Sequence, residues 1–92
     1  MSVTVYLSGY LKSYTGGETQ TQLDTDFATA GETLDTLWKV FPALRDRILT
    51  EQGEIRQHVN IFVGSDDVKH LKGLDTPLKS DELHIFNAVS GG

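Results

Sequence analysis

The sequence predicts an α+β fold, in which a mixed sheet of four to five strands carries one main helix packed on one face. Two observations support this prediction. Apolar and polar residues alternate at a period of two near both ends of the chain and again in its second half. Between those stretches, one segment changes to the period of an α-helix. Because 92 residues suffice for only one core, the strands and the helix should pack together as one domain.

The N-terminal part of the chain predicts two strands. Residues 2–7, SVTVYL, alternate and are rich in β-branched side chains, which is typical of a strand. Residues 18–27, ETQTQLDTDF, are polar and threonine-rich, with Leu23 and Phe27 at one parity, and predict a half-exposed second strand. The loop between them contains Gly16 and Gly17, which can adopt a positive φ in a turn, so the two strands should form a hairpin. The side chains predicted to be buried in the first strand are Val3, Val5 and Leu7.

The main helix is predicted by an apolar stripe at positions i, i+3, i+4 and i+7, formed by Leu34, Leu37, Trp38 and Phe41. Thr33 or Gly31 is predicted to cap its start. Pro42 should interrupt this helix or begin a second short one. In that second helix, Leu44 and Ile48 would continue the apolar face.

Two further strands are predicted after the helices. Residues 58–63, HVNIFV, and 82–87, ELHIFN, both alternate. Residues 64–67 predict a turn, and residues 68–74 predict one helical turn. Strands on both sides of one main helix, in the order β-β-α-β-β, indicate a β-grasp arrangement. The side chains predicted to face the helix from these strands are Val59, Ile61, Val63, Leu83 and Ile85.

The opposite face of the sheet is predicted to carry aromatic side chains. If the aliphatic residues face the helix, Tyr6, Phe62 and Phe86 lie on the other side, each on a different strand. These strands become neighbours if the first, third and last strands are adjacent, and the polar residues around the cluster would be His58, Asn60 and His84. Exposed contiguous apolar surface on a small protein often marks an interface. The alternative is that a loop covers one or two of the rings.

Composition argues against several classes of function. The net charge of −5, from 13 acidic and 8 basic residues, disfavours a nucleic-acid partner. No run approaches the roughly 18 apolar residues of a membrane helix, and the N-terminus lacks the pattern of a secretory signal, so we expect a cytoplasmic protein without membrane contact. It should be a monomer that forms transient complexes.

Self-contained catalysis is also disfavoured. The chain has no cysteine, which excludes disulfides, thiolate metal sites and a thiol nucleophile. Of the three histidines, only His58 and His84 are predicted to lie near each other, without a third ligand, so no metal site is expected. Asp66 and Asp67 are better explained by a turn than by cation binding. No phosphate-binding loop or nucleophile motif is present, and the protein is predicted not to be an enzyme.

The last five residues, AVSGG, are predicted to form a flexible tail (88–92) after a β-grasp domain (1–87). Five extended residues reach about 16 Å, which suffices to thread a terminal carboxylate into a pocket of another protein. Glycine has no side chain to obstruct a narrow channel. Adenylation by ATP would turn the Gly92 carboxylate into an acyl donor. The alternative is that the glycines are incidental.

Three segments together resemble a known family: VNIFVGSDDV (59–68), GLDTPLKSDEL (73–83) and AVSGG (88–92). They are similar to the ubiquitin-like sulfur-carrier proteins of the MoaD and ThiS type, and most similar to the CysO-like branch. The resemblance runs along nearly the whole chain and is strongest from residue 56 onward. The sequence departs from the family pattern at Asn87, where many relatives have proline before the tail.

The resemblance implies a mechanism and two kinds of partner. An E1-like enzyme of the MoeB/ThiF type would adenylate Gly92 with ATP, and a sulfur donor would convert it to a thiocarboxylate. Gly91 would be the slim neighbour that this chemistry requires. A sulfur-accepting synthase would then deliver the sulfur to a biosynthetic acceptor, and the carrier itself would bind no cofactor. Phe86 matches a hydrophobic contact residue of the family, and the predicted partner-binding residues are Tyr6, Phe62, Phe86, Val89 and Ser90.

The resemblance leaves the acceptor open among cysteine, molybdopterin, thiazole and other sulfur metabolites. It also leaves two alternative functions. One is a ubiquitin-like modifier joined to lysines through Gly92. The other is a β-grasp binding module whose tail has no chemical role.

Overall fold

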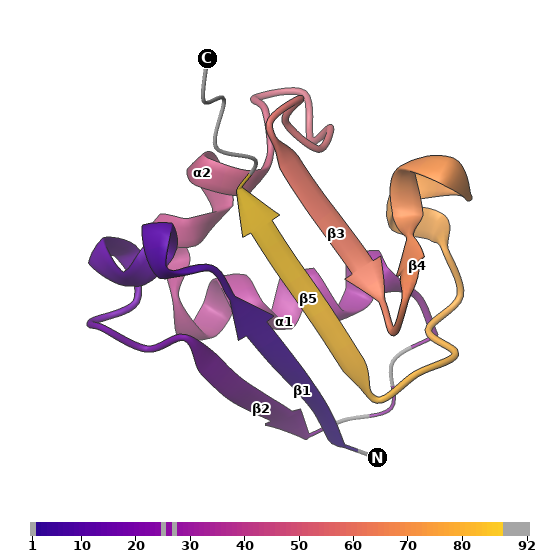
Figure 1. Cartoon of the computed structure of the whole chain (residues 1–92), viewed down its shortest axis with the longest axis horizontal. Helices are drawn as coiled ribbons and strands as arrows, with labels where there is room; N and C mark the ends of the chain where they lie inside the picture. The colour runs from indigo at the N-terminus through magenta and orange to yellow at the C-terminus, as the bar shows by residue number, and fades with distance from the viewer. Residues whose placement is uncertain (1, 25, 27, 88–92) are drawn as a thin grey trace.

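A five-stranded mixed sheet with one main helix on one face forms the protein, as the computed structural model shows for residues 2–24, 26 and 28–87 (Figure 1). The strand order is β2-β1-β5-β3-β4. The two central strands, β1 and β5, are parallel, and every other pair is antiparallel. The first, third and last long strands are therefore adjacent, as predicted. The strands are β1 (Ser2–Leu7), β2 (Gln20–Asp24), β3 (Val59–Val63), β4 (Asp66–Asp67) and β5 (Glu82–Asn87).

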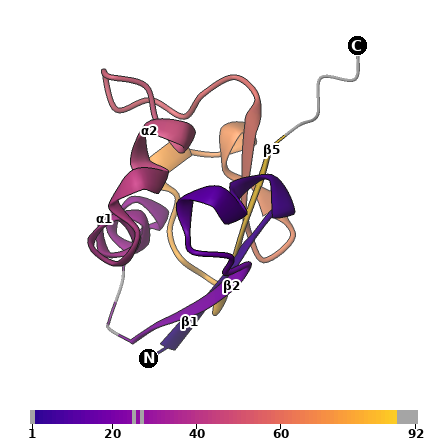
Figure 2. The ribbon, with the colours of Figure 1, turned by 90° about the vertical axis from the view of Figure 1, so that its left-hand side faces the viewer.

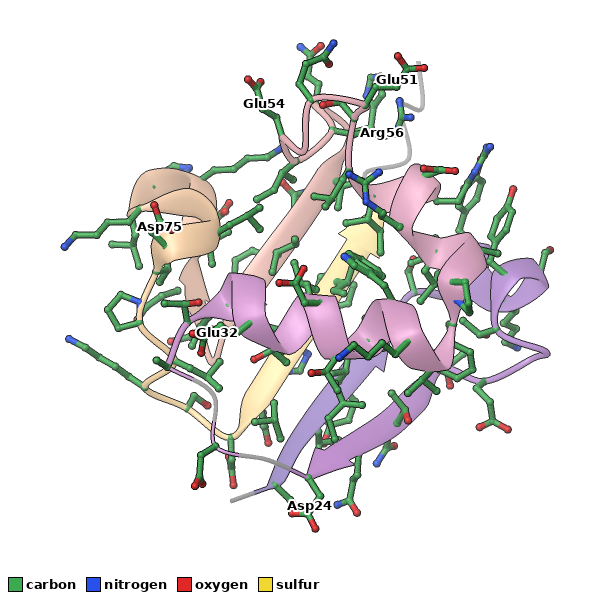
Figure 3. All side chains as sticks on the ribbon, turned by 180° about the vertical axis from the view of Figure 1, so that it is seen from behind. Asp24, Glu32, Glu51, Glu54, Arg56 and Asp75 are labelled. Atoms are coloured by element: carbon green, nitrogen blue, oxygen red, sulfur yellow. The ribbon has the colours of Figure 1, made fainter. Side chains whose placement is uncertain are left out.

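Helix α1 (Ala30–Val40) packs on one face of the sheet (Figure 2). The aliphatic side chains of the strands face it and form the core. Seen from behind, α1 lies across this face of the sheet (Figure 3). Each long strand shows the alternation that the sequence predicts, with its aliphatic residues buried. The strand residues in this core are Val3, Val5, Leu7, Leu23, Val59, Ile61, Val63, Leu83 and Ile85.

The N-cap of helix α1 lies two residues before one predicted cap, Gly31, and four before the other, Thr33. The N-cap is Thr29, whose Oγ1 accepts a hydrogen bond from the Glu32 backbone N–H at 3.2 Å. The Glu32 carboxylate in turn accepts from the Ala28 backbone N–H at 2.7 Å, so this first turn resembles a capping box. The predicted capping by Thr33 or Gly31 was wrong, because both residues lie inside the helix and the Thr33 hydroxyl donates to the Thr29 carbonyl oxygen.

The helix ends where proline was expected to interrupt it. Pro42 starts a 3₁₀ turn, η2 (Pro42–Leu44), and the short helix α2 (Arg45–Ile48) follows. Leu44 and Ile48 are fully buried and continue the apolar face, as predicted. Trp38 and Phe41, by contrast, are only partly buried and pack at the margin of the core.

Three local predictions need correction. The second strand is shorter than residues 18–27, since β2 covers Gln20–Asp24, and Phe27 lies outside the described residues. The loop before it contains a 3₁₀ helix, η1 (Gly9–Tyr14), which buries Leu11 in the core. Of the turn predicted at 64–67, only residues 64 and 65 form a turn, because Asp66 and Asp67 pair with β3 as strand β4. The backbone register decides this pairing, and two acidic residues give no apolar alternation that would reveal a strand.

The connection from β4 to β5 contains two short 3₁₀ helices, η3 (Val68–His70) and η4 (Gly73–Asp75), where one helical turn was predicted. The latter packs against α1, and Asp75 is labelled on it in Figure 3. Among the described residues, no helix has the length and apolar character needed to cross a membrane.

Candidate functional site

The open face of the sheet, on the side away from α1, carries four rings on the three adjacent strands β1, β5 and β3. We call the surface formed by Tyr6, Phe62, His84 and Phe86 the outer face. The strand register brings these rings together, since His84 on β5 lies opposite both Tyr6 on β1 and Phe62 on β3. The predicted aromatic cluster therefore forms, and it depends on the central position of β5.

The rings of the outer face contact one another in a continuous row. His84 stacks on Tyr6 with ring centroids 4.6 Å apart and an interplanar angle of 13°. Phe86 lies on the other side of His84 at 5.8 Å, nearly parallel to it. Phe62 meets Phe86 edge-on at 6.1 Å. Offset-stacked and edge-to-face pairs are favourable ring arrangements, so the surface is ordered before any partner binds.

Within the described residues, no loop covers Phe86, which is 41% exposed, while Tyr6, Phe62 and His84 are half-buried. The alternative of rings hidden under a loop is thus ruled out for Phe86. An exposed phenylalanine in contact with other rings is typical of an anchor residue that becomes buried when a protein partner binds.

A carboxylate borders the aromatic row. Glu82 Oε1 lies 3.2 Å from His84 Nε2, which makes His84 a hydrogen-bonding centre within an otherwise apolar surface. Sequence patterning placed His84 near the cluster but missed its stacking between Tyr6 and Phe86. Asn60 lies opposite Phe86 in the register, as expected, whereas His58 is exposed just before β3.

The described part of the chain holds no cluster of three or more histidine, aspartate or glutamate side chains able to bind a metal ion. His70 lies within 3.8 Å of Asp67, far along the chain from His84.

The end of β5 is fixed to the end of β1. The Ser8 backbone N–H donates to the Ile85 carbonyl at 3.0 Å, and the Asn87 backbone N–H donates to Ser8 Oγ at 3.4 Å. Asn87 is the last described residue, and its side-chain Oδ1 is buried without a hydrogen-bond partner among the residues that the structure describes. Strand β5 therefore ends at a defined position at one end of the sheet, next to the end of β1.

Four predicted site residues follow this point. Val89, Ser90, Gly91 and Gly92 lie outside the described residues, so their predicted roles stay predictions. Sequence patterning also gave no role to Tyr10, which is 67% exposed on η1, the segment that follows β1. A lone tyrosine in a loop has no periodic pattern that would single it out.

Comparison with known families adds the decisive observation: the model of the ThiS family matches residues 5–92, nearly the whole chain. The chain belongs to the ThiS family. This confirms the predicted membership of the ubiquitin-like sulfur carriers. The match includes the strands of the outer face and extends through the diglycine segment.

Individual relatives of this ThiS-family chain agree with the assignment. Sulfur carrier protein CysO of Mycobacterium tuberculosis is 30% identical over 95 residues and covers 100% of both chains. Small archaeal modifier protein 3 of Haloferax volcanii is 37% identical over 68 residues, 73% of each chain. A chain in the crystal structure of the Amycolatopsis orientalis BexX/CysO complex superposes with a TM-score of 0.83 at 30% identity, covering 98% of this chain and 99% of that one. The β-grasp fold is thereby confirmed.

Proposed function

We propose that this protein is a sulfur carrier, in which a β-grasp domain (1–87) presents a reactive tail (88–92) to other enzymes. The observation that carries this proposal is that β5 bears His84 and Phe86 on the outer face and leads directly into the diglycine segment. A partner that binds the rings is therefore held beside the origin of the tail. The match of the ThiS family through Gly92 supports the same reading.

The chemistry belongs to the Gly92 carboxylate. Its oxygen attacks the α-phosphorus of ATP on an E1-like enzyme of the MoeB/ThiF type, which forms an acyl adenylate and releases pyrophosphate. A sulfide donor then attacks the acyl carbon, AMP leaves, and a thiocarboxylate remains. Gly91 keeps the channel to this carbon narrow and unobstructed. The carrier itself acts as a co-substrate with no bound cofactor, since ATP is bound by its partner.

The outer face supplies the contacts that hold the enzymes. Phe86, Phe62 and Tyr6 are proposed to dock on an apolar surface of the activating enzyme, while Val89 and Ser90 line its channel. The complex of the related CysO with BexX supports binding to a partner enzyme. A sulfur-accepting synthase would use the same face in turn, and the acceptor would be a sulfur metabolite such as cysteine or molybdopterin.

A second function is conjugation of Gly92 to lysine side chains. The 37% identity with small archaeal modifier protein 3 supports this candidate. An amine in place of sulfide attacks the same acyl adenylate, so both functions share the activation step and differ only in the nucleophile.

One experiment separates the two functions. The protein is incubated with an E1-like enzyme, ATP and sodium sulfide, with ATP omitted as the control, and its intact mass is measured. A sulfur carrier gains the mass difference between one sulfur and one oxygen at Gly92. A modifier instead forms larger covalent species in cells, visible after reducing denaturation. An unchanged mass with several E1-like enzymes, and no larger species, would contradict the proposal.

A further inference from the structure

A second surface feature lies at the far edge of the sheet. Between the end of β3, strand β4 and the connection to β5, the structure contains a cavity of about 450 Å³, which we call the β4 hollow (Figure 1 shows these elements). Its size falls in the range of ligand-binding pockets. Its apolar lining comes from Val63, Leu71 and Pro77.

The β4 hollow is formed before anything binds, because backbone hydrogen bonds hold its wall. Thr76 is buried, and its Oγ1 accepts from the Lys72 backbone N–H at 3.1 Å. The Thr76 carbonyl accepts from the Ala30 backbone N–H at 3.0 Å, which ties the wall to the start of α1. A preorganised surface loses less conformational entropy on binding than a mobile one.

The rim of the β4 hollow carries more positive than negative charge. Lys72 and Lys79 line it together with one acid, Asp66, in a chain whose net charge is −5. Within the described residues, neither lysine ammonium group makes a hydrogen bond or an ion pair. Lys69, in contrast, donates from Nζ to the Gln57 carbonyl at 3.0 Å. Two lysines without an ion pair, beside an apolar lining, favour an occupant with carboxylates and an apolar group.

Exposure at the rim indicates the size of that occupant. Leu71 is 55% exposed and lies at the border of the hollow. A small molecule inside the hollow would leave much of this side chain in water. A polypeptide segment that crosses the rim would cover it and bring acidic side chains to the lysines on either side.

We propose that the β4 hollow is a second protein-docking site, which takes an acidic segment of a partner protein with one apolar side chain inserted. It lies at the opposite end of the sheet from the origin of the tail. In the antiparallel pair of β3 and β5, Val63 at the hollow lies opposite Leu83, whereas Val59 lies opposite Asn87. A partner can therefore stay docked here while the outer face and the tail engage an enzyme. This inference does not depend on the proposed sulfur chemistry.

The test is a titration of ¹⁵N-labelled protein with the acetylated, amidated peptide DELFDE at low salt. We expect amide shifts at the hollow, at Val63, Leu71, Lys72 and Lys79. The double variant K72E/K79E should bind about tenfold more weakly, because two attractive charge pairs are each replaced by repulsion. The matched control is K12E/K39E, which changes the net charge equally at two exposed lysines elsewhere and should keep the affinity.

Further arms define what would overturn the proposal. The peptide DESSDE and the variant Leu71→Ser should each weaken binding, and Leu71 is exposed enough for the fold to survive. Deletion of Gly91 and Gly92 should leave peptide binding unchanged. Equal weakening by both double variants, shifts centred on Phe62 and Phe86, or no binding at millimolar peptide would each refute the site. Hexanoate that binds as tightly as the peptide would show a small-molecule site instead.

Discussion

At the scale of single residues, backbone geometry and not side-chain chemistry determines which residue type a few positions accept. Gly64 connects β3 to β4 with a φ of +60°, and a Cβ built on it would lie 3.2 Å from the Ser80 side chain. Gly9, at the start of η1, has neither a positive φ nor any neighbour within 4 Å of such a Cβ. The backbone at position 64 therefore requires a glycine, whereas the backbone at position 9 does not, and the sequence alone does not distinguish the two.

We predict that Gly64→Ala destabilises the protein by about 1–2 kcal/mol, because a left-handed backbone is unfavourable for a residue with a Cβ. The close contact with Ser80 adds to this effect. Gly9→Ala is the matched control and should change the free energy of unfolding by less than about 0.5 kcal/mol. Urea unfolding followed by circular dichroism measures both. Equal stabilities of the two variants would show that the turn tolerates a Cβ.

At the scale of elements, strand β5 contributes side chains both to the core and to the outer face. Its residues alternate between the two faces, so Ile85 is fully buried against α1 while its neighbour Phe86 is 41% exposed among the rings. The sequence predicted this alternation correctly from the apolar period. The stacking of His84 between Tyr6 and Phe86 could not be predicted, because it requires the parallel pairing of β1 with β5.

For β5 we predict opposite phenotypes for two adjacent substitutions. Ile85→Ala should destabilise the fold by about 2–5 kcal/mol, since it leaves a cavity in the core. Phe86→Ala should leave the unfolding midpoint nearly unchanged but weaken binding to the activating enzyme by about tenfold or more, as expected for an exposed aromatic anchor. Isothermal titration calorimetry and urea unfolding test the pair. Collapse of the fold in the Phe86 variant would assign that ring to the core.

At the scale of the whole molecule, the stable part and the reactive part are proposed to be separate. The sheet, α1 and the 3₁₀ segments enclose the core within the described residues, and the hydrogen bonds at Ser8 fix the end of β5. Among the described residues, the last one in the core is Ile85. We therefore propose that the tail can be changed without changing the packing that holds the domain together.

Deletion of Gly91 and Gly92 should accordingly leave the unfolding midpoint in urea unchanged, because we propose that the tail lies outside the core. The same variant should lose all thiocarboxylate formation in the mass-spectrometric assay, since the acyl group is displaced from the active site of the partner. A variant that retained activity would support a plain binding module. A variant that unfolded would instead contradict the division between residues 1–87 and 88–92.

The sequence by itself determined the order of the four long strands and the main helix, the buried faces of those strands and the family. Alternation and helical period depend on local chain geometry, so they can be read along the sequence. Only the tertiary structure decided what depends on contacts between distant residues: the pairing of the acidic strand β4, the row of stacked rings and the β4 hollow. Each of these features brings together residues that are distant in the chain. The register between strands and the packing of loops place them side by side, and neither leaves a periodic pattern in the sequence.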